Sequence, residues 1–91
     1  MIYTLDFTDS AKREIALLRK SDSISYKKLV RLLEELVEHP TTGTGKPEPL
    51  KGNRTGQWSR RISRKHRLIY EIREEIITVL ILSSYDHYDD K

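Results

Sequence analysis

The stretch Ile76-Ile77-Thr78-Val79-Leu80-Ile81-Leu82 would place apolar side chains on both faces of an extended chain. Strands of this kind lie inside a sheet, because other parts of the protein cover both of their faces. A chain of 91 residues has room for one domain with one modest hydrophobic core. We therefore expect residues 1–91 to form a single domain, in which the strand at 76–82 lies centrally in a sheet and helices cover one side.

Three further segments alternate apolar and polar residues in the way that is typical of half-buried strands, namely 2–7, 57–62 and 67–73. Residues 63–65 are expected to join the second and third of these strands, and Glu74-Glu75 to turn the chain into the last one. Trp58 could stack on a nucleic-acid base, but a place in the core is the stronger expectation.

Two helices are expected between the first and second strands. Thr8 or Asp9 can cap the first helix, which should run to about Lys20, and a second apolar stripe runs from Tyr26 to Val37. Pro40 should end that helix, because proline disfavours helical geometry at the residue before it. The order β-α-α-β-β-β predicts an α+β fold, a small, mainly antiparallel sheet with two N-terminal helices packed on one face.

All four glycines and all three prolines fall between Pro40 and Gly56, so this is the one long irregular segment that the sequence predicts. Loops of this size without secondary structure are uncommon in compact domains and are often functional, although a merely flexible connection is the plain alternative. We expect a functional loop here.

The charge is unevenly distributed. Residues 46–67 hold eight of the 17 basic residues and one of the 14 acidic residues, a net charge of +7, which leaves −4 for the remainder. This predicts one strongly positive region on an otherwise acidic body and a polyanionic partner. The alternative is a set of solvated surface residues without a partner.

Several classes of protein are disfavoured. The chain has no cysteine, which excludes disulfides and zinc-thiolate sites and suits a reducing compartment. The start of the chain lacks the features of a signal peptide, and no apolar stretch is long enough to span a bilayer, so we expect a cytoplasmic protein that does not contact a membrane. Neither a phosphate-binding glycine loop nor a glycine-flanked serine elbow occurs.

Three residues could together cleave RNA without a metal or other cofactor. That reaction needs a base for the ribose 2′-hydroxyl, a cation facing the crowded phosphate and an acid for the departing 5′-oxygen. Glu48 lies between two prolines that restrict its backbone, Arg67 opens a strand, and His87 follows the last strand. Taken alone, Glu48 could merely offset local positive charge, and His87 could be an ordinary surface residue.

A metal site is the less favoured alternative. Asp86-His87-Tyr88-Asp89-Asp90 concentrates potential ligands, but an acidic tail preorganises no coordination geometry, and His39 and His66 lie elsewhere in the chain. Tyr88 could stack on a base, touch a phosphate or pack on the rim of the domain. We expect no bound metal.

The block Gly45-Lys46-Pro47-Glu48-Pro49-Leu50-Lys51 is followed by Trp58-Ser59-Arg60-Arg61-Ile62, His66-Arg67-Leu68-Ile69-Tyr70 and a late His87-Tyr88. Together these blocks resemble the YoeB/Txe branch of the RelE-like toxins of toxin-antitoxin systems. The resemblance covers the second half of the chain, whereas the first half matches only as a strand and two helices. It departs from the family at Asp89-Asp90-Lys91, which follow the tyrosine, and in an acidic segment before His87.

The resemblance implies a toxin that enters the ribosomal A site and cleaves mRNA there until a cognate antitoxin blocks it. Glu48 then matches the general base, Arg67 the transition-state arginine, His87 the general acid and Tyr88 the tyrosine beside it, with His66 as the fallback acid. Lys51 and Arg61 match supporting basic residues. Ribosomal RNA would be contacted by the remaining basic residues of the window, Lys46, Arg54, Arg60, Arg64 and Lys65.

On this reading the partners are mRNA, the ribosome and an antitoxin, with operator DNA reached only through that antitoxin, and formation of a homodimer is open. A rival interpretation from another class is a non-catalytic RNA- or protein-binding module that uses the same basic surface.

Overall fold

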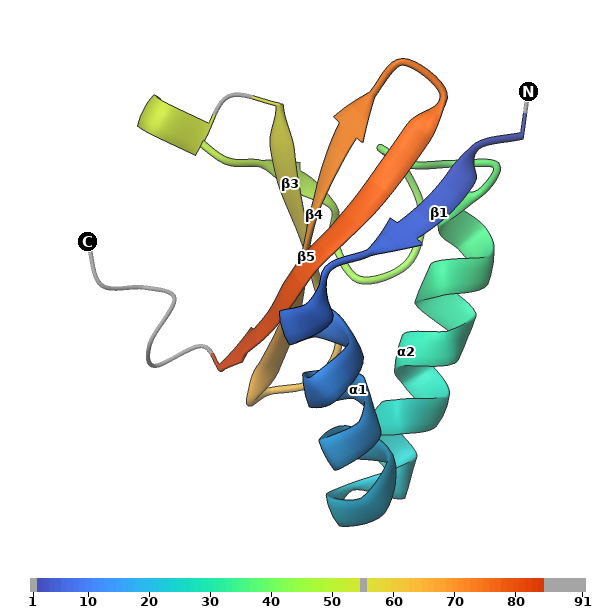
Figure 1. The fold of residues 1–91 in the computed structure, drawn as a ribbon, viewed down its shortest axis with the longest axis vertical. Helices are drawn as coiled ribbons and strands as arrows, with labels where there is room; N and C mark the ends of the chain where they lie inside the picture. Colours follow the sequence, from blue (N-terminus) through green and yellow to red (C-terminus); the bar gives the residue numbers. More distant parts are fainter. Residues whose placement is uncertain (1, 55, 85–91) are drawn as a thin grey trace.

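The computed structural model describes residues 2–54 and 56–84. Its elements are β1 (Thr4–Phe7), α1 (Asp9–Ser21), α2 (Ser23–Leu36), β2 (Glu48–Pro49), the short 3-10 helix η1 (Gly52–Arg54), β3 (Gln57–Arg61), β4 (His66–Arg73) and β5 (Ile76–Ser84). The strands form one sheet in the order β1-β5-β4-β3-β2, and Figure 1 shows the two helices side by side next to it.

The α+β architecture that the sequence predicts is confirmed. Strands β2 to β5 pair antiparallel, and β1 pairs parallel to β5, so the sheet is mixed but mainly antiparallel. β5 is an interior strand between β1 and β4, as its apolar sequence requires. No helix in the described part of the chain is long and apolar enough to cross a membrane.

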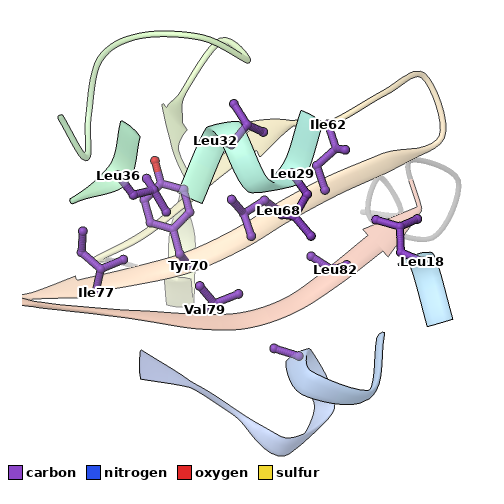
Figure 2. Close-up of a cluster of buried hydrophobic side chains, with 11 residues drawn as sticks. Leu18, Leu29, Leu32, Leu36, Ile62, Leu68, Tyr70, Ile77, Val79 and Leu82 are labelled. Carbon is purple, nitrogen blue, oxygen red and sulfur yellow. The ribbon is translucent and has the colours of Figure 1, made fainter. Parts of the chain in front are cut away.

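Both helices contribute to one hydrophobic core on a single face of the sheet. Leu29, Leu32 and Leu36, spaced at three and four residues, form the buried stripe of α2. Figure 2 shows these leucines facing Leu68 and Tyr70 on β4 and the apolar residues of β5. Ala11 and Leu18 supply the buried side of α1, and Trp58 packs against the same cluster, which agrees with its expected place in the core.

Side chains at the helix starts join the helices to the sheet. The Thr8 hydroxyl accepts a hydrogen bond from the Ala11 amide and donates one to the Leu80 carbonyl. Leu80 is the extra residue of a β-bulge, because Ile69 pairs with Ile81 while Tyr70 pairs with Val79. The cap therefore fixes both the start of α1 and its position along β5.

The loop expected to be irregular contains structure that the sequence did not predict. β2 and η1 both lie in it, so the sheet has five strands rather than four. α2 ends at Leu36, before His39, the residue at which Pro40 would stop it. The backbone N–H groups of Glu38 and His39 both donate to the Glu35 carbonyl just after the end of the helix.

A buried arginine holds the first part of this loop against the sheet. The Arg60 side chain has no solvent exposure, and all five of its N–H donors have acceptors. Nη1 donates to Glu35 Oε1 at 2.8 Å and to the Thr44 carbonyl at 3.1 Å. Nη2 donates to the carbonyls of His39 and Thr42, and Nε to the hydroxyl of Tyr70.

The partners of Arg60 are themselves fixed. Thr44 donates to Glu35 from its hydroxyl at 2.7 Å and from its backbone N–H at 2.9 Å, and these bonds, together with the nearby Arg60 guanidinium, lower the pKa of Glu35 below its ordinary value. Burial raises the pKa of Tyr70, so its hydroxyl stays protonated and donates to the Pro40 carbonyl. We refer to Arg60, Glu35, Thr44 and Tyr70 as the Arg60 cluster.

The lowered pKa of Glu35 predicts a pH-dependent contribution to stability. The folded state binds the Glu35 proton less tightly than the unfolded state, so this contribution is complete above the ordinary value of 4.5 and disappears as the pH falls below it. We expect Glu35→Gln to lower the free energy of unfolding most above pH 4.5. The difference from the wild type should shrink in more acidic buffer, as urea titrations across the range would measure.

Glu34→Gln is the matched control, because Glu34 is the exposed neighbour on the same helix. Its effect on the free energy of unfolding should not follow this profile. A difference between Glu35→Gln and the wild type that stays constant through the acidic range would contradict the assignment.

Candidate functional site

The sheet presents two chemically different faces. Side chains of directly paired residues point to the same face, and successive residues alternate between faces. Arg60 pairs with Leu68 and faces the helices, whereas Ser59 pairs with Glu48 and lies on the opposite face. Arg61 and Arg67, which pair with each other, share that opposite face. Glu48, Ser59, Arg61 and Arg67 therefore form the candidate site.

Glu48 and Arg67 are brought together from segments that are far apart in the sequence. Arg67 Nη1 lies 3.8 Å from Glu48 Oε2 and donates to Ser59 Oγ at 2.7 Å. The Arg67 side chain is only 14% exposed and that of Glu48 is 56% exposed. The guanidinium is thus recessed in the sheet face, while the carboxylate next to it is open to solvent.

This arrangement suits chemistry on a phosphate diester. A recessed guanidinium presents planar donors to phosphate oxygens, and the adjacent carboxylate can accept a proton from a hydroxyl beside that phosphate. Ser59 is completely buried, and its hydroxyl fixes one end of the guanidinium. The two groups are therefore held by secondary structure rather than by a flexible loop alone.

Most of the expected RNA-contacting residues are exposed. Lys46 and Lys51 lie on either side of β2, Arg54 ends η1, Arg61 ends β3, and Arg64 and Lys65 form the β3–β4 turn. Lys46 adopts a left-handed backbone conformation with φ of 51°, immediately before the proline that precedes Glu48. All six of these basic residues are exposed, and none of them belongs to the hydrophobic core.

The expectation that Arg60 contacts RNA does not fit the structure. Its side chain has no exposed surface, and its donors are occupied by the Arg60 cluster and by the carbonyls of His39 and Thr42. The physical reason is strand alternation, because two adjacent arginines in a strand must point to opposite faces. Arg61 takes the open face, and Arg60 is directed into the protein.

The exposed surface of the two helices carries more basic than acidic side chains. The helices expose six basic side chains and only two acidic ones, Asp9 and Glu34; the basic ones are Lys12, Arg13, Arg19, Lys20, Lys27 and Arg31. The protein therefore carries a second set of basic residues on the helices.

The C-terminal site residues fall beyond the described part of the chain. His87 and Tyr88 are among residues 85–91, as is the acidic tail at 86–90 that was the alternative metal site. β5 is described up to Ser84, which pairs with His66 directly beside Arg67. The fallback acid His66 is half-buried, and its backbone N–H bonds to Ser63 Oγ.

Within residues 2–54 and 56–84, no three carboxylate, histidine or thiol groups are close enough together to hold a metal ion. A hollow at the far end of β4 and β5 is lined by Thr4, Glu74, Glu75 and Ile76. Its two carboxylates would repel a phosphate, so it does not compete with the Glu48–Arg67 pair as a site for RNA.

Ser59 belongs to the candidate site, although the sequence alone did not single it out. Its neighbours drew attention by charge, and a single serine in a strand carries no signal of its own. The available clue was alternation, because Ser59 falls two residues before Arg61 and hence on the same face. Only the pairing of β3 with β4 shows that this serine meets Arg67.

Comparison with known proteins agrees with the α+β fold. Residues 7–88 match the family described as the YoeB-like toxin of bacterial type II toxin-antitoxin systems. A protein described as Toxin YoeB from Synechocystis sp. is 38% identical over 82 residues, which cover 90% of this chain and 93% of that protein.

Two solved structures from Staphylococcus aureus are also similar. Each is 31% identical in sequence, and each alignment covers 91% of this chain and 97% of the S. aureus chain. One is a YoeB dimer, with a TM-score of 0.80, and the other is a heterotetrameric YoeB-YefM toxin-antitoxin complex, with a TM-score of 0.78. The chain therefore belongs to the YoeB-like family of toxins of bacterial type II toxin-antitoxin systems.

Proposed function

We propose that this toxin is an endoribonuclease that cleaves mRNA in the ribosomal A site, using only its own side chains. The observation that carries the proposal is the Glu48–Arg67 pair, a solvent-open carboxylate 3.8 Å from a recessed guanidinium. Exposed basic residues in the surrounding loops and turns support it, because they suit the phosphates of a polyanion.

The reaction is a transesterification within the RNA. Glu48 removes the proton from the ribose 2′-hydroxyl, whose oxygen forms a bond to the adjacent phosphorus as the bond to the 5′-oxygen breaks. Arg67 faces the phosphate oxygens and stabilises the negative charge that grows there. His87 donates a proton to the departing 5′-oxygen, which leaves a cyclic phosphate and a free 5′-hydroxyl.

Chain geometry is compatible with His87 as the acid. β5 runs antiparallel to β4 and is described up to Ser84, beside the strand end that carries Arg67. His87 is three residues after Ser84. Three residues of extended chain cover at most about 10 Å, which sets the greatest distance between these two residues.

Tyr88 follows directly and is proposed to contact the base or phosphate next to the cut. Lys46, Lys51, Arg54, Arg61, Arg64 and Lys65 are proposed to contact RNA phosphates, which position a protein without reading sequence.

We further propose that a dedicated antitoxin protein binds this toxin and blocks the site, that operator DNA is reached only through that antitoxin, and that the toxin can form a homodimer. The S. aureus YoeB-YefM complex and YoeB dimer support the antitoxin and the homodimer by similarity. Cytoplasmic mRNA on ribosomes is the proposed target.

Substitutions in the site should separate catalysis from binding. With purified ribosomes and a defined mRNA, the wild type should cut at the A-site codon, as primer extension would detect. Glu48→Gln, Arg67→Ala and His87→Gln should each lower the single-turnover rate by about 100-fold or more, because each removes one chemical role. Ribosome affinity should change little, since the exposed basic residues remain.

Lys20→Ala, on an exposed part of α1, is the control and should cut normally. A wild type that leaves the mRNA intact while binding the ribosome would instead favour a non-catalytic binding module. If His66→Gln abolishes cutting and His87→Gln does not, the acid is His66.

Ser59→Ala should lower the cleavage rate by about tenfold, because the hydroxyl that accepts from Arg67 is lost while the guanidinium remains. The effect should fall on the single-turnover rate and not on the concentration of ribosomes needed for half-saturation. Equal rates for Ser59→Ala and the wild type would show that this hydrogen bond does not orient Arg67.

A further inference from the structure

Arg60 lies between two residues of the candidate site but points the other way. Ser59 and Arg61 face the open side of the sheet, and Arg60 reaches through to the helix side. There its guanidinium bonds to the carbonyls of His39, Thr42 and Thr44, which are spread over six consecutive residues of loop. One side chain of β3 thus holds the loop that leads to Glu48.

The path from this anchor to Glu48 is short, because only Gly45, Lys46 and Pro47 lie between Thr44 and Glu48. Directly after Thr44, the Gly45 carbonyl accepts the Arg61 N–H at 2.7 Å. Pro47 and Pro49 flank Glu48 and have no N–H to donate to the sheet. Glu48 then pairs with Ser59 in the β2–β3 ladder, and beyond that pair the Leu50 N–H donates to the Gln57 carbonyl. β2 is only two residues long, so contacts at its two ends add to this short ladder in fixing its position.

Glu35 makes the anchor electrostatically stable. A guanidinium without solvent exposure needs a negatively charged partner and an acceptor for every N–H group. Glu35 supplies the charge from α2 and also binds both the backbone N–H and the hydroxyl of Thr44. The loop, the helix and β3 therefore meet at one ion pair.

We infer that the Arg60–Glu35 ion pair is a positioning device for the candidate site, which fixes residues 45–48 along β3 and thereby sets the separation between the Glu48 carboxylate and the Arg67 guanidinium. Arg60 and Glu35 are positioning residues and do not touch the RNA. The catalytic consequence rests on the proposed function, whereas the structural consequence does not.

Two glycines provide a matched pair of tests. Gly45 has φ of +87°, and an added Cβ would lie 2.9 Å from the Arg61 carbonyl oxygen and 3.3 Å from Leu32 Cδ2. Gly56 has φ of +91°, and its Cβ would meet nothing within 4 Å. Alanine brings the same left-handed backbone strain at both positions, but only at Gly45 does it push the loop away from β3.

The first measurement is hydrogen exchange at the backbone amides of Arg61 and Leu50, whose hydrogen bonds join β3 to the chain on either side of Glu48. This measurement does not depend on activity. Gly45→Ala and Glu35→Gln should each lower the protection of the Arg61 amide by about tenfold or more relative to amides of the β4–β5 core. Gly56→Ala should leave this ratio unchanged. So should Asp22→Ala, which removes the cap of α2 and controls for a general loss of stability.

The second measurement is single-turnover cleavage on the ribosome. Gly45→Ala and Glu35→Gln should cut about 10- to 100-fold more slowly, as expected for a misplaced catalytic group, with ribosome affinity kept within about twofold. Gly56→Ala and Asp22→Ala should cut at the wild-type rate.

The inference is overturned if Gly45→Ala and Glu35→Gln keep wild-type protection at Arg61, or if they lose it and still cut at the wild-type rate. It is also overturned if Gly56→Ala loses as much activity as Gly45→Ala. A wild type that does not cut RNA contradicts the proposed function alone, and the exchange experiment then still decides whether the ion pair holds this loop.

Discussion

The structure depends on the buried positive charge of Arg60. A buried guanidinium is tolerated only when its charge is paired and each of its donors is satisfied. Arg60 meets that condition by gathering one carboxylate from α2, three carbonyls from the following loop and one hydroxyl from β4. The end of α2, the course of the loop and the start of β2 are therefore linked through one side chain.

The two faces of the sheet have different roles. Its helix side is filled by leucines, isoleucines and Tyr70, which supply the apolar burial that a small domain needs. Its other side carries Glu48, Ser59 and Arg67, held by the register of β2, β3 and β4. Because adjacent residues serve opposite faces, Ser59 supports the site while Arg60, next to it, anchors the loop.

Much of this arrangement could be predicted from the sequence, because periodicity alone separates strands from helices. The alternation at 57–62 and 67–73, the stripe of α2 and the apolar run of β5 each agree with the element that formed. β2 could not be predicted in the same way, since the two residues Glu48 and Pro49 are too few to carry a periodic signal, and their pairing depends on β3 and the anchored loop.

The site was predictable in part and for a different reason. Glu48 and Arg67 have residue types suited to phosphate chemistry, and the fold brings their side chains to 3.8 Å. Arg60 was misassigned because charge in a sequence suggests a surface, and burial of a charge depends on partners that are distant in the chain. His87 and Tyr88 lie outside the described residues and stay predictions.

The most direct test of the central claim is a cryo-EM structure of the toxin on a ribosome whose A-site codon carries 2′-O-methyl riboses, which block the attacking hydroxyl. We expect one phosphate within hydrogen-bonding distance of Arg67, with the adjacent methylated 2′-oxygen next to the Glu48 carboxylate. The opposite result would be mRNA phosphates that contact only the basic residues of α1 and α2, with the Glu48–Arg67 pair facing solvent.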